Sequence, residues 1–81
     1  MMAAKTKEER FVVELYDQAE DLGDFEEFIE VSKVADAVGL GPKAIKNVLN
    51  TLAGANFIRK RSPNQVALTQ NGIRLAEELL G

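Results

Sequence analysis

The chain has 81 residues, of which 46% are hydrophobic, which is enough for one small core and too apolar for a disordered chain. It contains neither cysteine nor histidine, so disulfides, thiolate nucleophiles and the usual nitrogen ligands of metal sites are excluded. Its N-terminal residues meet charge before any apolar run, and no apolar stretch approaches the roughly 20 residues of a membrane span. We expect a cytoplasmic protein without cofactor or metal, with residues 1–5 as a disordered N-terminus and residues 6–81 as a single domain.

The net charge of −3 is divided unevenly along the chain. Residues 1–39 carry four basic and eleven acidic side chains (net −7), whereas residues 40–81 carry six basic and two acidic ones (net +4). Salt screens charges over about 8–10 Å, so a partner responds to the local field rather than to the total. The second half is therefore suited to a polyanion, and the first half to a basic partner.

The first predicted helix begins after Thr6. Thr6 and Glu9 have the spacing of a capping box, in which each side chain satisfies a free backbone amide of the other residue. Apolar residues then recur every three to four positions over residues 11–22, which indicates one buried stripe. Gly23 is placed to end this helix in the left-handed conformation.

Residues 25–31 fit either a helical turn or a short strand. We favour a connection that ends in a short extended piece, because Ser32 is then placed to cap a second helix. That helix is brief, with Val34 and Ala35 among its inward residues, and Gly39 stops it.

A tight turn and a strongly amphipathic helix follow. Gly41 is free to cap the helix, and Pro42 suits the first helical position because its missing amide hydrogen costs nothing there. The helix is predicted over residues 42–53, and Gly54 closes it. Its inward stripe consists of Ile45, Val48, Leu49 and Leu52.

The last part of the chain predicts a hairpin and a final helix. Residues 57–61 and 65–68 read as strands, and residues 62–64 supply the turn between them. Thr69 then caps a helix with an apolar stripe. The predicted fold is mainly α with a small β-hairpin, in the order helix, short strand, helix, turn, helix, strand, strand, helix.

The stretch from Val31 to Leu80 resembles the winged helix-turn-helix family, the scaffold of many small bacterial and archaeal transcriptional regulators. The resemblance is carried by VSKVADAVGLGPKAIKNVLNTLAGANFIRK and, after a short wing, by VALTQNGIRLAEELL. The matching positions are Ala35, Gly39, Leu40, the helix 42–53, the run Gly54 to Arg59, and Leu68, Thr69 and Gly72. The resemblance implies sequence-specific binding of double-stranded DNA, with the recognition helix 42–53 in the major groove and the wing 57–68 on the backbone or in the minor groove.

Four residues on the outward side of the recognition helix are candidates for DNA contact. They are Lys43, Lys46, Asn47 and Asn50. Lysine neutralises phosphates or reaches guanine, and asparagine pairs with adenine through two hydrogen bonds. The alternative is that these residues form an ordinary solvated helix face.

Three further basic residues are candidates outside this helix. Strand alternation sends Arg59 and Arg61 to one side of the hairpin and Lys60 to the other, and we expect the two arginines to contact phosphate or the minor groove. Lys33 is a candidate anchor on the DNA backbone. The alternative for the hairpin is that its charges protect an exposed strand edge from aggregation.

Two other functions are alternatives to DNA binding. Eight acidic residues between Glu14 and Glu30 lack the calcium-loop pattern, and they fit a surface that repels DNA or docks a basic protein partner. An enzyme is not expected, since no nucleophile and base are available as a pair. Because one recognition helix buries little surface, we also expect a homodimer through the first and last helices, the last contributing Ile73, Ala76 and Leu80.

Overall fold

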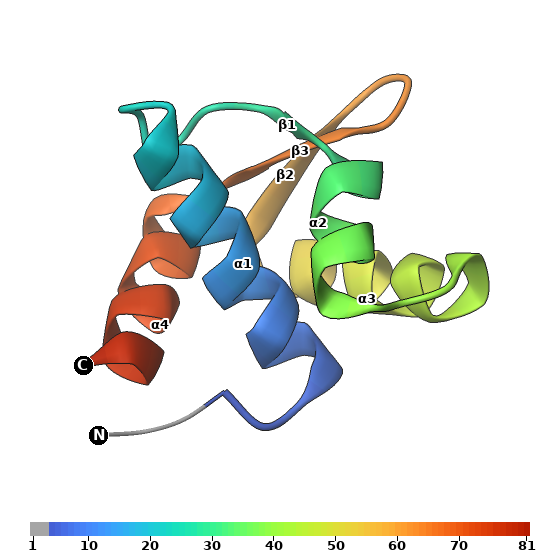
Figure 1. Ribbon diagram of the computed structural model, residues 1–81, viewed down its shortest axis with the longest axis horizontal. Coiled ribbons are helices and arrows are strands. Elements are labelled where there is room, and N and C mark those ends of the chain that lie inside the picture. Colours follow the sequence, from blue (N-terminus) through green and yellow to red (C-terminus); the bar gives the residue numbers. More distant parts are fainter. Residues whose placement is uncertain (1–3) are drawn as a thin grey trace.

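A computed structural model describes residues 4–81 as four helices and a three-stranded antiparallel sheet (Figure 1). The elements in chain order are α1 (Lys7–Asp21), β1 (Ile29–Glu30), α2 (Val31–Val38), α3 (Pro42–Gly54), β2 (Ile58–Arg61), β3 (Gln65–Leu68) and α4 (Gln70–Leu80). The predicted order and fold class are confirmed. Of the expected N-terminal segment 1–5, residues 1–3 lie outside the described residues.

Helix α1 has the predicted capping box. The Thr6 hydroxyl accepts a hydrogen bond from the Glu9 amide at 3.0 Å, and the Glu9 carboxylate accepts from the amides of Thr6 at 3.0 Å and Lys5 at 3.1 Å. These backbone donors lower the pKa of the Glu9 carboxyl. At the other end Gly23 has a φ of +82°, so the predicted left-handed terminator is also confirmed.

Helix α2 begins at Val31, two residues earlier than a Ser32 cap requires, so that prediction is wrong. The N-cap is Glu30, no side chain caps the helix, and Ser32 lies exposed within the first turn. The reason is a contact distant in sequence: the Val31 amide donates to the carbonyl of Asn64, at 2.8 Å, so β1 passes directly into the helix. Gly39, with a φ of +72°, ends α2 as predicted.

Helix α3 starts as predicted and ends differently. Gly41 is its N-cap and Pro42 its first residue, but the helix continues through Gly54. The left-handed residue that ends it is Asn56, whose φ is +62°. The amides of Asn56 and Phe57 donate back to the carbonyls at 53 and 52, at 3.1 and 2.9 Å, which is a Schellman motif with asparagine in place of glycine.

Strand β3 lies in the middle of the sheet, between β1 and β2. Helix α1 crosses the centre of the molecule and contacts α2, α3 and α4, with α4 on one side of it and α2 on the other (Figure 1). The largest fully buried side chains come from four elements, α1, α2, α3 and β3: Phe11, Val12, Leu15, Val34, Val48, Val66 and Leu68. None of the helices in the described part of the chain has the length and apolar character needed to traverse a bilayer.

A dense junction joins the start of the hairpin to the start of α4. The Thr69 hydroxyl accepts from the Gly72 amide at 3.1 Å and donates to the carbonyl of Asn56 at 2.6 Å, while the Thr69 amide donates to the carbonyl of Phe57 at 3.1 Å. A Cβ atom on Gly72 would overlap that Phe57 oxygen and would lie 2.9 Å from a methyl of Leu68. The glycine in the L-T-x-x-G run is therefore required for close packing.

We predict that Gly72→Ala destabilises the protein by about 1–3 kcal/mol, since the added methyl overlaps backbone that cannot move freely. In an open helical position the same change stabilises by about 0.5–1 kcal/mol. Gly54→Ala is the matched control, because a Cβ there would have no neighbouring atom within 4 Å. Urea titrations followed by circular dichroism measure both variants, and equal free energies of unfolding would contradict the packing argument.

Candidate nucleic-acid interface

Helix α3 presents the four predicted polar residues on its exposed side. Lys43, Lys46, Asn47 and Asn50 are all exposed. On the opposite side, Val48 and Leu52 are 1% and 2% exposed and belong to the core. The apolar stripe thus fixes the rotation of the helix, and the polar side chains share one solvent-facing surface.

The two wing arginines lie on the face of the sheet that points away from the helices. In β2 the buried residue is Ile58, so Arg59 and Arg61, of opposite parity, are on the outer face. Their guanidinium carbons lie 5.5 and 4.0 Å from the centroid of the Phe28 ring. Arg59 is also 4.0 Å from a carboxylate oxygen of Glu26. The structure therefore does not bring these arginines together with the α3 lysines.

Lys60 lies on the other face of the hairpin. It has the parity of Ile58 and pairs with Val66, which is fully buried. Lys60 and Leu49 of α3 line one hollow between that helix and the hairpin. The sequence analysis did not predict Lys60 as a site residue. The signal was present, because Ile58 is the single apolar residue of β2 and side chains alternate along a strand, so Lys60 lies on the same face as Ile58.

Lys33 is also separate from the α3 lysines. It is exposed on α2, where its carbonyl accepts a hydrogen bond from Gln18 of α1 at 3.3 Å. It lines a hollow together with Asp21 and Leu22, from the end of α1. This places Lys33 on the α1 side of α2, away from the start of α3.

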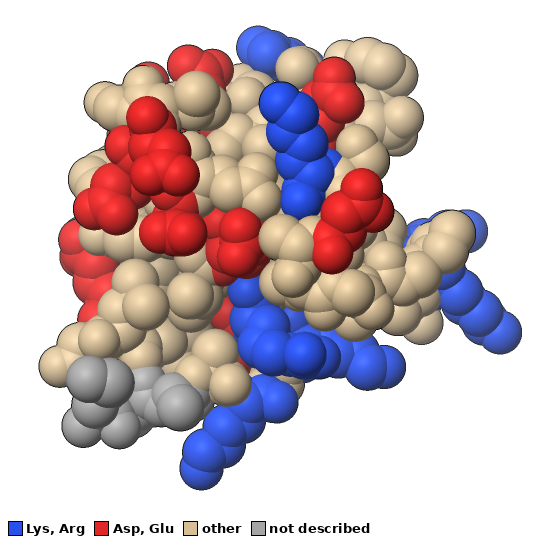
Figure 2. Space-filling view, viewed as in Figure 1, with Lys and Arg blue, Asp and Glu red and all other residues tan. Residues whose placement is uncertain are grey.

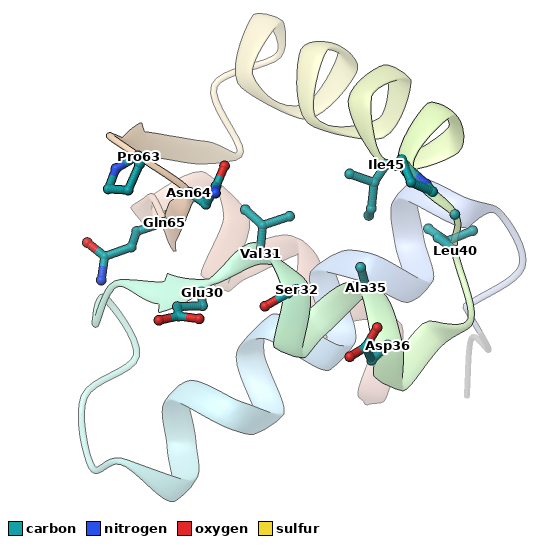
Figure 3. A pocket seen from close by; sticks show the side chains of 12 residues that line it. Glu30, Val31, Ser32, Ala35, Asp36, Leu40, Ile45, Pro63, Asn64 and Gln65 are labelled. Carbon is teal, nitrogen blue, oxygen red and sulfur yellow. The ribbon is translucent and has the colours of Figure 1, made fainter.

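A pocket of about 520 Å³ lies between α2, the start of α3 and the turn of the hairpin (Figure 3). Val31 and Ile45 face one another across it, and the carboxylates of Glu30 and Asp36 stand along its α2 side (Figure 3). The residues that line it include no lysine or arginine. Negative charge therefore lies beside the first turn of the helix that carries Lys43.

The acidic side chains gather elsewhere, over the C-terminal half of α1 and the loop after it, while the basic ones extend mostly along the lower and right edges of the view (Figure 2). Leu22, at the end of α1, is 63% exposed beside this acidic surface. Within residues 4–81 no three carboxylates are grouped closely enough to hold a metal ion.

The Tyr16 hydroxyl donates a hydrogen bond to the Glu77 carboxylate at 3.4 Å. Partial burial, together with the negative charge of that carboxylate, raises the pKa of the Tyr16 hydroxyl.

The apolar stripe of α4 is less available for a dimer than the sequence suggested. Ala76 is fully buried in the core of the chain itself, and Ile73 is half-buried against that core. Leu80 is 46% exposed. Of the three residues expected at a dimer seam, Leu80 is therefore the one with a large free surface.

Comparison with known proteins supports the fold. No protein-family model matches the sequence, and no curated protein matches it. Among solved structures, the MarR family protein Rv2887 of Mycobacterium tuberculosis is similar with a TM-score of 0.68 and 21% identity, over 94% of this chain and 52% of that one. MepR, described as a transcription regulator of the Staphylococcus aureus multidrug efflux pump MepA, is similar with a TM-score of 0.67 and 21% identity, over 93% and 55%.

The chain spans about half the length of these two proteins, neither of which is described as an enzyme. The predicted winged helix-turn-helix is confirmed: α2 and α3 form the helix-turn-helix, and β2 and β3 form the wing.

Proposed function

We propose that the protein binds double-stranded DNA in a sequence-specific manner as a small transcriptional regulator, with α3 as the recognition helix in the major groove and the wing on the backbone or in the minor groove. The observation that carries this proposal is the exposed polar side of α3. Lys43, Asn47 and Asn50 follow one another along it at the spacing of successive helical turns. The major groove is about 12 Å wide and admits one α-helix, so these side chains would meet base edges together.

The charge distribution supports the same orientation. The acidic surface lies over α1 and the loop after it, away from the exposed side of α3 (Figure 2). A polyanion is repelled from the first surface and attracted to the second, which orients the approach. The net charge of −3 also reduces non-specific binding, because that binding is almost wholly electrostatic.

A homodimer is part of this proposal. A single recognition helix contacts few base pairs, and regulators of this kind gain affinity when two copies bind half-sites of a two-fold operator. Helices α1 and α4 are the proposed seam, since Leu22 and Leu80 are the exposed large hydrophobic residues of the described chain.

A second candidate function is a protein-interaction module. The specific observation in its favour is Leu22, which is 63% exposed beside the carboxylates of Glu20 and Asp21. An exposed apolar residue that follows two acidic residues in the chain suits a partner segment with a hydrophobic residue and lysine or arginine next to it. In this function the acidic half would dock the partner, and α3 would remain free.

We predict that a Lys43→Ala/Lys46→Ala double variant binds duplex DNA more weakly, with a smaller dependence on salt. Each phosphate contact contributes about 0.9 to the slope of log affinity against log salt, so the slope should fall by about 0.9 for each lysine that contacts phosphate. Fluorescence anisotropy titrations at several salt concentrations measure both quantities.

The single variants Lys43→Ala and Lys46→Ala are each compared with Arg74→Ala on α4, which also removes one exposed positive charge but on a helix far from α3 (Figure 1). It should leave the slope unchanged. If the wild type does not bind DNA even at low salt, the regulator function fails and the basic-partner function takes its place.

We also predict that a Glu30→Gln/Asp36→Asn double variant binds DNA more tightly than the wild type. These carboxylates border the pocket beside the first turn of α3, and unit charges 4–8 Å apart in water interact by about 0.5–1 kcal/mol, which corresponds to roughly a twofold to fivefold gain. Glu77→Gln/Glu78→Gln on α4 makes the same change in net charge as a control. An equal gain from both variants would mean that net charge matters and the position of these carboxylates does not.

A further inference from the structure

We propose that the cations of the wing have two separate tasks: Lys60 contacts the DNA, and Arg59 and Arg61 are positioning residues that hold the hairpin in place by stacking on Phe28. This inference rests on the proposed function and makes it more specific. It also reverses the assignment that the sequence alone suggested for these three residues.

The first observation is the parity of β2. Ile58 is 3% exposed and pairs with Leu68, and Lys60 pairs with Val66, so all four side chains belong to the face that packs on the helices. Lys60 itself is exposed, although its cross-strand partner Val66 is fully buried. Its long side chain therefore leaves the sheet on the side where α3 lies.

The second observation joins Lys60 to α3. A hollow of about 250 Å³ is lined by Leu49 from that helix and by Lys60, Arg61 and the turn residues 62–64 from the hairpin, although the guanidinium group of Arg61 lies over the Phe28 ring. Leu49 lies between Lys46 and Asn50 in the helix sequence. A DNA backbone that follows the exposed side of α3 would thus pass within reach of the Lys60 ammonium group.

The third observation is that both arginines already have partners on the outer face. The Phe28 ring has the Arg61 guanidinium 4.0 Å from its centroid and the Arg59 guanidinium 5.5 Å from it. Arg61 also donates to the side-chain oxygen of Gln65 at 2.9 Å, and Arg59 lies 4.0 Å from Glu26. A guanidinium over an aromatic face is held by the electrostatic attraction of the ring.

This cluster links segments that are distant in sequence. The β1–β3 register pairs Ile29 with Val66, and continued by one residue it sets Phe28 beside Ala67, which pairs with Arg59 on the other side. Ala67 is fully buried although it lies on the outer face. Phe28 and Arg59 flank Ala67 from the two neighbouring strands, where their side chains are placed to cover it. Loss of Phe28 would loosen the wing without removing any charge.

The salt dependence of DNA affinity separates a contact from a positioning role. Lys60→Gln should lower the slope of log affinity against log salt by about 0.9, the value for one phosphate. Phe28→Leu and Arg61→Gln should weaken binding while the slope stays at the wild-type value, and Phe28→Tyr, which keeps the ring, should restore affinity. A slope lowered by Arg61→Gln and unchanged by Lys60→Gln would overturn the proposal.

A measurement on the free protein tests the arginine contact without DNA. The ring current of Phe28 should shift the side-chain methylene protons of Arg61 upfield in the NMR spectrum, and Phe28→Leu should remove this shift. Circular dichroism confirms that each variant is folded. Unshifted Arg61 methylenes in the wild type would overturn the positioning role. If the wild type fails to bind DNA, the proposed function and the role of Lys60 fail together, and the NMR result alone decides the role of the arginines.

Discussion

The packing of α3 against α1 is the interaction on which the rest of the molecule depends. Val48 and Leu52, one turn apart, are nearly fully buried and join Phe11 and Leu15 in the core. A rotation of α3 that put Asn47 and Thr51 in the places of Val48 and Leu52 would bring an amide and a hydroxyl into that core, at a cost of several kcal/mol for each unpaired buried polar group. The core therefore decides which side of α3 meets solvent, and the surface proposed for DNA follows from it.

The wing is held by different contacts. At its base, Thr69 ties the end of α3 to the start of α4 through the carbonyls of Asn56 and Phe57. Along its outer face, the guanidinium groups of Arg59 and Arg61 lie over the Phe28 ring. These contacts join segments on both sides of the helix-turn-helix, so the position of the hairpin relative to α3 is set by residues that are not themselves proposed to touch DNA.

The sequence alone predicted what depends on local patterns. The capping box, the Gly39 stop and the Pro42 start follow from neighbours within one helical turn, and the apolar period predicted the exposed side of α3 correctly. It failed where a distant residue decides the outcome. The carbonyl of Asn64, distant along the chain, accepts from the Val31 amide, so α2 starts before Ser32. The contacts of Arg59 and Arg61 with the Phe28 ring likewise join residues too distant in sequence for a local pattern to indicate them. The carboxylates of Glu30 and Asp36 likewise come beside α3 only through the tertiary fold.

The most direct test of this account is an NMR titration of the ¹⁵N-labelled protein with duplex DNA, followed at the backbone amides. We expect the largest shifts on the exposed side of α3 and on the hairpin around Lys60, while the amides of α1 from Glu14 to Asp21 and those of α4 from Arg74 onward change little. Shifts confined to α1 and the acidic loop, or no shifts at a low salt concentration, would contradict the claim that α3 is the recognition helix of a DNA-binding domain.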